Sequence, residues 1–73
     1  MKHIFVVEDD ASILQLLKMT LKHGGFAVSW AIGLSDVKEE LDRIDPDLAV
    51  IDIGLKDGLG YEIVPALKEK NIP

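Results

Sequence analysis

Two short runs of apolar residues, each without a polar interruption, constrain the fold of this 73-residue chain more than any other feature. The first lies within His3–Val7 and the second is Leu48–Ile51. A strand that faces solvent on one side alternates apolar and polar residues, whereas a strand buried on both faces is apolar throughout. Both runs are therefore typical of inner strands of a parallel sheet.

Segments with helical periodicity follow the first run. Residues 11–22 place apolar side chains on one broad helical stripe, which comprises Ile13, Leu14, Leu16, Leu17 and Leu21. Asp10 or Ser12 is a suitable cap for the first turn, and the glycines at 24 and 25 predict the end of the helix. A short strand at residues 26–30 and a second helix at residues 33–43 are expected next.

The last third of the chain repeats this order. Residues 54–60 predict a loop, and residues 61–70 have helical spacing through Ile63, Val64 and Leu67. Pro65 lacks the N–H group that a helix interior requires, so we expect either a kink there or a later start of the helix. Strands and helices that alternate in this way predict an α/β fold with a parallel sheet and right-handed crossovers.

Acidic residues follow both apolar runs. Glu8, Asp9 and Asp10 come after the first strand, and Asp52 closes the third. Sites in open parallel sheets form beyond the carboxyl ends of the strands, where the strand order reverses. If the strand at residues 26–30 lies outside the first strand, the first and third strands are neighbours and their acids converge.

Converging carboxylates repel one another unless a cation neutralises them, and a set of oxygen ligands selects Mg²⁺, Mn²⁺ or Ca²⁺. Each acid taken singly is more often a solvated surface group or a helix cap, as we expect of Asp10. The four acids at two strand ends, taken together, favour a cation site.

Composition excludes several other classes of protein. Thirteen acids against eight bases give a net charge of −5, which argues against direct contact with nucleic acid. No apolar run approaches the roughly 18 residues of a membrane span, so no membrane association is expected. The lack of cysteine excludes a disulfide scaffold and fits a reducing compartment, which predicts a cytoplasmic protein.

Four local motifs together resemble the receiver domain of response regulators from two-component systems. They are Val6-Val7-Glu8-Asp9-Asp10, the turn Gly24-Gly25-Phe26, Asp52, and the segment Asp57-Gly58-Leu59-Gly60-Tyr61-Glu62. The resemblance runs along the whole chain but covers only about three of the five βα units of a flavodoxin-like receiver. It implies a truncated, doubly wound parallel sheet, (βα)3, with strand order 2-1-3 and without strands four and five and their helices.

The resemblance also implies a role for each acid. Asp52 is the implied phosphoacceptor, which receives a phosphoryl group from a histidine kinase or a phosphotransfer protein. Asp9 is an implied direct ligand of Mg²⁺, Glu8 binds it directly or through water, and Asp52 and the backbone carbonyl of Gly54 complete the set. These roles suit Mg²⁺, which typically binds one or two carboxylates, waters and phosphate oxygens.

The chain departs from the family pattern in two ways. Lys56 stands where family members usually have proline, so we expect a looser loop before Asp57 and Gly58. The family's Ser or Thr after strand four and Lys after strand five have no counterpart here, so we expect metal binding without competent switching. The third strand becomes an apolar edge, which predicts a homodimer or a swapped assembly through that strand.

Two other functions are weighed against this one. The first is a metal-dependent phosphohydrolase, but the typical Asp-x-Asp spacing does not occur at Glu8-Asp9-Asp10-Ala11, so we do not expect an enzyme. The second is a self-association module that does not switch.

Several residues receive a purely structural interpretation. The glycines at 54, 58 and 60 lack the spacing of a phosphate-binding loop and are interpreted as turn residues. His3 and His23 have no second histidine nearby in sequence and are not expected to be ligands. Phe26 and Trp30 are expected in the core, because their segment contains no basic residue with which to form a stacking platform.

Overall fold

The computed structural model describes residues 2–52, 54–55 and 58–73. Its main sheet contains three parallel strands, β1 (His3–Val7), β2 (Ala27–Ala31) and β3 (Leu48–Ile51), in the order β2-β1-β3. Ile4 pairs with Val28 on one side and with Leu48 on the other. The parallel sheet and the 2-1-3 order predicted from the sequence are both confirmed.

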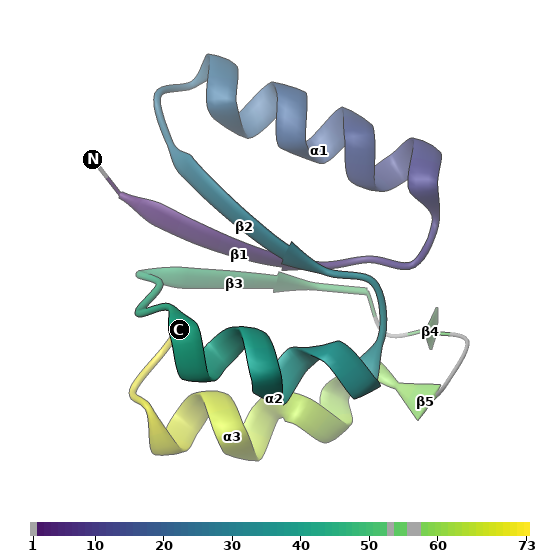
Figure 1. Cartoon of the computed structure of the whole chain (residues 1–73), viewed down its shortest axis with the longest axis vertical. Coiled ribbons are helices and arrows are strands. Elements are labelled where there is room, and N and C mark those ends of the chain that lie inside the picture. Colours follow the sequence, from purple (N-terminus) through teal and green to yellow (C-terminus); the bar gives the residue numbers. More distant parts are fainter. Residues whose placement is uncertain (1, 53, 56–57) are drawn as a thin grey trace.

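Helices cover both faces of this sheet (Figure 1). Helix α1 (Ala11–His23) lies on one face, and α2 (Leu34–Arg43) and α3 (Val64–Glu69) lie on the other. Phe5 and Val7 are buried in the cluster on the side of α2 and α3, whereas Ile4 and Val6 are buried with Leu14 of α1. Strand β1 is therefore buried on both faces, as its unbroken apolar run predicts.

Local signals in the sequence set the ends of α1. The Asp10 carboxylate accepts hydrogen bonds from the backbone N–H groups of Ser12 at 2.9 Å and Ile13 at 3.0 Å. Asp10 is therefore the N-cap of α1, one of the two caps that the sequence suggested. The helix ends at Gly24, and Gly25 adopts a positive φ of 90°, a conformation that only glycine reaches without strain.

The segment after β3 differs in detail from the expected single loop. A two-residue antiparallel pair, β4 (Gly54–Leu55) with β5 (Gly58–Leu59), lies within it. A 3-10 turn at Gly60–Ile63 follows, and α3 begins only at Val64. Pro65 thus lies in the first turn of α3, where its missing N–H group costs nothing, and the expected later start of the helix is confirmed.

The expected helical stripe of α1 is wrong in part. Leu14 is buried, but Leu16 is 65% exposed and Ile13 is also exposed. Only α1 covers this face of the sheet among the described residues, so the side chains at the margins of a broad stripe have no element to pack against. Within the described residues, no helix is both long enough and apolar enough to cross a membrane.

The expectation that Phe26 and Trp30 belong to the core is also wrong, since both are more than one-third exposed. Trp30 lies on β2, one of the two edge strands of the described sheet, and the Nζ atoms of Lys18 and Lys22 lie 3.5 Å and 5.9 Å from the centroid of its ring. The basic residues come from α1 rather than from the strand itself. The residues next to Trp30 in the sequence therefore do not indicate its contact with these lysines.

The outer edge of β3 is less bare than the sequence suggested. The backbone N–H of Ala49 donates to the carbonyl of Pro73 at 3.0 Å, so the end of the chain occupies part of this edge. Ala49 and Ile51 pack against the cluster under α2 and α3. Leu48 and Val50 alternate to the opposite face, where both are exposed.

Candidate metal and phosphoacceptor site

The predicted acidic site lies at the carboxyl ends of β1 and β3. Glu8, Asp9 and Asp52 each offer a carboxylate oxygen, and these three oxygens lie within 4.8 Å of one another. Glu8 is only 6% exposed, and Asp9 and Asp52 are half-buried. The convergence that the sequence made conditional on adjacent parallel strands is confirmed.

Backbone hydrogen bonds that continue the sheet hold these acids in place. The N–H of Asp52 donates to the carbonyl of Val7 at 2.9 Å, which extends the pairing of β3 with β1 by one residue. The N–H of Glu8 donates to the carbonyl of Ala31 at 3.1 Å, which extends the pairing of β1 with β2. The paired strands therefore position the backbones of Glu8 and Asp52.

The surroundings of Glu8 shift the pKa of its carboxyl group upwards. Burial raises the pKa of its carboxyl above the ordinary value, and the negative charges of Asp52 and Asp9 and a hydrogen bond to the Asp52 side chain raise it further. The backbone N–H of Asp10, which donates to Glu8 Oε1 at 3.1 Å, opposes this shift. In the absence of a cation the surroundings of Glu8 therefore make its charged form less favourable than that of a free side chain.

Asp10 is separate from this group, because its carboxylate caps α1. The three remaining acids fit a hard divalent cation, since they supply only oxygen ligands and a cation would relieve the repulsion that raises the pKa of Glu8. Mg²⁺, Mn²⁺ and Ca²⁺ share this preference for oxygen.

The structure describes only some of the loop residues that the sequence analysis named. Gly54 belongs to β4, and its role as a carbonyl ligand stays a prediction. Lys56 and Asp57 lie outside the described residues. Gly58 has φ of 154°, and a Cβ atom at this position would overlap Leu34 Cδ1, so the geometry requires glycine there.

A parallel sheet with an acidic cluster at the carboxyl ends of its first and third strands is the arrangement that the resemblance to receiver domains implies, and comparison with known proteins identifies the family. The family described as "Response regulator receiver domain" matches residues 4–73. The chain therefore belongs to the receiver domain family of response regulators.

Curated relatives agree with this assignment. The chain is 35% identical to the photosynthetic apparatus regulatory protein RegA of Rhodobacter capsulatus, over 94% of this chain and 38% of that protein. It is 30% identical to the transcriptional regulatory protein TrcR of Mycobacterium tuberculosis, over 94% of this chain and 27% of that protein. The chain thus spans less than half the length of these relatives.

Solved structures show the same fold. The receiver domain of HemR from Leptospira biflexa, in its non-phosphorylated form, superposes with a TM-score of 0.87 at 30% identity, over 96% of this chain and 56% of that one. The response regulator TrrA from Thermotoga maritima, solved in complex with Mg²⁺ and BeF, gives a TM-score of 0.86 at 28% identity, over 96% of this chain and 61% of that one.

Proposed function

We propose that Asp52 is the phosphoacceptor of a two-component signalling protein, and that it receives its phosphoryl group from a phosphohistidine of a histidine kinase or a phosphotransfer protein. The convergence of Glu8, Asp9 and Asp52 within 4.8 Å carries this proposal. Membership of the receiver family supports it, as does the similarity to a regulator solved with Mg²⁺ and BeF.

Asp9 and Asp52 would hold Mg²⁺ together with the carbonyl of Gly54, and Glu8 would bind it directly or through water. Mn²⁺ and Ca²⁺ are the alternative ions. The bound cation supplies positive charge that offsets the negative charge of the incoming phosphoryl oxygens. The three carboxylates repel such a group on their own, so we expect no phosphorylation without the ion.

The transfer itself is a displacement at phosphorus. A carboxylate oxygen of Asp52 attacks the phosphorus atom, an O–P bond forms, and the P–N bond to the donor imidazole breaks. The imidazole nitrogen leaves with the electron pair and takes up a proton. The hydrogen bond from the backbone N–H of Asp52 to the carbonyl of Val7 holds the backbone of the nucleophile at the end of the sheet.

The chain corresponds to 56% to 61% of the two solved receivers above. We propose that residues 1–73 form a partial receiver of three βα units that lies in the cytoplasm. In the family, a Ser or Thr after strand four and a Lys after strand five sense the phosphoryl group. Neither position falls within residues 1–73, so we propose for these residues only the acceptance of one phosphoryl group per chain at Asp52.

A specific observation favours a second function, self-association through β3. Leu48 and Val50 are exposed on this strand, and no described strand pairs with its outer edge. Two copies joined there, or copies that exchange elements, would form a longer sheet. Because Pro73 already occupies the N–H of Ala49, this pairing requires the end of the chain to move away first.

Intact-mass spectrometry after incubation with phosphoramidate and Mg²⁺ tests the principal proposal. We expect one added phosphoryl group on the wild type, none on Asp52→Asn, and none when EDTA replaces Mg²⁺. Asp42→Asn, a matched loss of one exposed acid on α2, should be labelled like the wild type. A phosphoryl group that persists on Asp52→Asn would overturn the assignment.

Sedimentation at micromolar concentration separates the second function from the first. A dimer that phosphoramidate does not label favours the self-association module, whereas a monomer that it labels at Asp52 excludes that module.

A further inference from the structure

The outer edge of β2 offers backbone groups to a further strand. The N–H of Ala27 donates to the carbonyl of Lys2 at 2.9 Å, and the carbonyl of Ala31 accepts from the N–H of Glu8 at 3.1 Å. Backbone groups alternate in direction along a strand, so those of Val28 and Trp30 point away from β1. Strand β2 ends the described sheet, which leaves this edge as a template for pairing.

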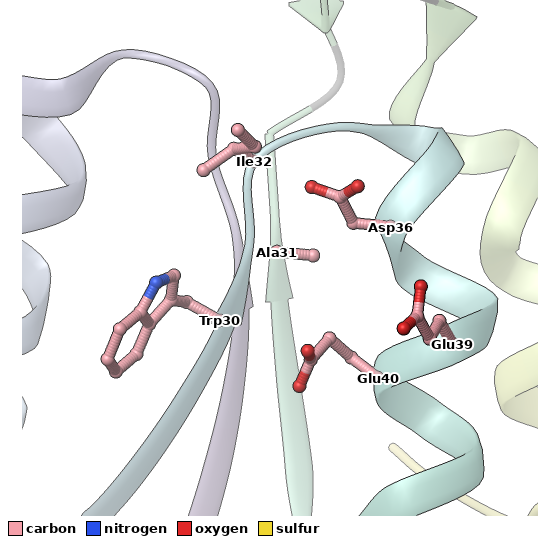
Figure 2. A pocket seen from close by; sticks show the side chains of 6 residues that line it. All are labelled: Trp30, Ala31, Ile32, Asp36, Glu39 and Glu40. Carbon is pink, nitrogen blue, oxygen red and sulfur yellow. The ribbon is translucent and has the colours of Figure 1, made fainter.

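Two hollows lie along this edge. One of about 260 Å³ is lined by Trp30 of β2 and by Asp36, Glu39 and Glu40 of α2, among others. The other, of about 270 Å³, is lined by Val28, Ser29, Trp30 and Glu40. Figure 2 shows the Trp30 ring on one side of the β2 ribbon and the three acids on the other. The two sides of the edge therefore differ in chemistry.

A basic side chain lies next to Trp30 on one side of the edge, and another lies next to the acids on the other side. Lys18 lies over the Trp30 ring, at 3.5 Å from its centroid, and supports the ring from the side of α1. Arg43 lies 2.8 Å from Glu39 in an exposed ion pair, which is weak, and 3.6 Å from the half-buried Glu40. The acidic side therefore keeps a net negative charge that a cationic side chain would reduce.

We propose that the β2 edge binds an extended segment of another protein in which lysine or arginine alternates with apolar residues. The segment would add to the sheet as a further strand, and its backbone would bond to Val28 and Trp30. Since side chains alternate between the two faces of a strand, the apolar ones would contact Trp30 and the basic ones would reach Glu39 and Glu40. Glu8, Asp9 and Asp52 do not line either of these two hollows.

Charge also decides against a second copy of this chain as the occupant. Pairing of β2 with β2 of another copy would bring the acids of two α2 helices towards each other. Like charges in such positions cost binding free energy. Charge repulsion therefore disfavours pairing of two copies of this chain at β2, whereas a basic segment is attracted to this edge.

A nine-residue peptide of alternating lysine and valine with a fluorescent label tests the proposal through its anisotropy on titration with the full chain. Two further peptides carry N-methyl groups on every valine or on every lysine, and each pattern blocks one edge of the peptide strand. We expect one of the two patterns to weaken binding more than tenfold and the other to have less than a threefold effect. Equal effects of the two patterns would overturn the proposal.

A pair of double variants tests the role of charge. Glu39→Gln with Glu40→Gln should weaken binding of the unmethylated peptide about tenfold. Asp42→Asn with Glu69→Gln, which removes the same charge from exposed positions elsewhere, should weaken it less than twofold. Equal losses in the two variants would mean that only net charge attracts the peptide, and the proposal would fail.

Discussion

Two groups of three acids in this molecule behave differently. Glu8, Asp9 and Asp52 are forced together at the ends of two strands, with Glu8 buried. Asp36, Glu39 and Glu40 lie along one helix, where Arg43 pairs with the two glutamates at the surface. In the first group, burial and the neighbouring charges raise the pKa of Glu8. In the second group, the Arg43 guanidinium places a positive charge beside the two glutamates.

The difference shows that the number of acids does not define a cation site. Backbone geometry and burial do so, because two neighbouring strands bring the backbones of the three acids together and burial separates Glu8 from water. A helix surface allows its acids to rotate away from one another. The following predictions test this contrast, and each compares one acid from the strand ends with one from α2.

The largest expected effect is stabilisation by Mg²⁺. At a concentration of Mg²⁺ about 100 times its Kd, the free energy of unfolding should rise by about 2.7 kcal/mol, because only the folded state brings the three carboxylates together. The corresponding rise in Tm is about 10 °C or more for a domain of this size, and thermal unfolding followed by circular dichroism measures it. Asp9→Asn should abolish the rise and Asp36→Asn should keep it. An equal rise in Tm with Mg²⁺ in the two variants would contradict the difference between the two groups of acids.

The second effect concerns Glu8 without metal. In EDTA at neutral pH, Glu8→Gln should raise the free energy of unfolding by about 1 to 2 kcal/mol, because it removes a buried charge and keeps an oxygen for the N–H of Asp10. Glu39→Gln, at an exposed ion pair, should change stability by less than about 0.5 kcal/mol. Urea denaturation measures both. A Glu8→Gln variant less stable than the wild type would show that the charged carboxylate stabilises the empty pocket.

The third effect is the pH dependence of the difference in unfolding free energy between Glu8→Gln and the wild type. The folded state raises the pKa of Glu8 above the value of 4.5 for the free side chain, so folding favours its protonated form. This favourable contribution is complete below pH 4.5 and disappears as the pH rises through the raised pKa. In EDTA, the stability advantage of Glu8→Gln over the wild type should therefore grow with pH across that window. An advantage that stays constant from pH 4 to 8 would contradict the assigned cause of the shift.

Features that depend on pattern along the chain could be predicted from the sequence. The apolar runs gave β1 and β3, and Pro65 predicted either a kink or a late start of α3, of which the late start occurs. The meeting of Glu8 with Asp52 required only that two parallel strands be neighbours. These features are set by local residue type and by sheet geometry, which leaves few alternatives.

Features that depend on how elements pack could not be predicted. Trp30 contacts Lys18, whose closeness follows from the placement of α1 over an edge strand. The bond between Ala49 and Pro73 joins residues far apart in the sequence. The exposure of Leu16 depends on what lies beside α1, and the helical periodicity of α1 alone cannot specify it.

The central claim is that one divalent ion is shared by the acids at the ends of β1 and β3 and not by those of α2. Paramagnetic broadening of backbone amide NMR signals by substoichiometric Mn²⁺ tests it most directly. The account predicts loss of the signals of Glu8, Asp9 and Asp52 at Mn²⁺ concentrations that leave those of Glu39 and Glu40 intact. Equal broadening at both groups, or broadening at the strand ends that persists in Asp9→Asn, would contradict it.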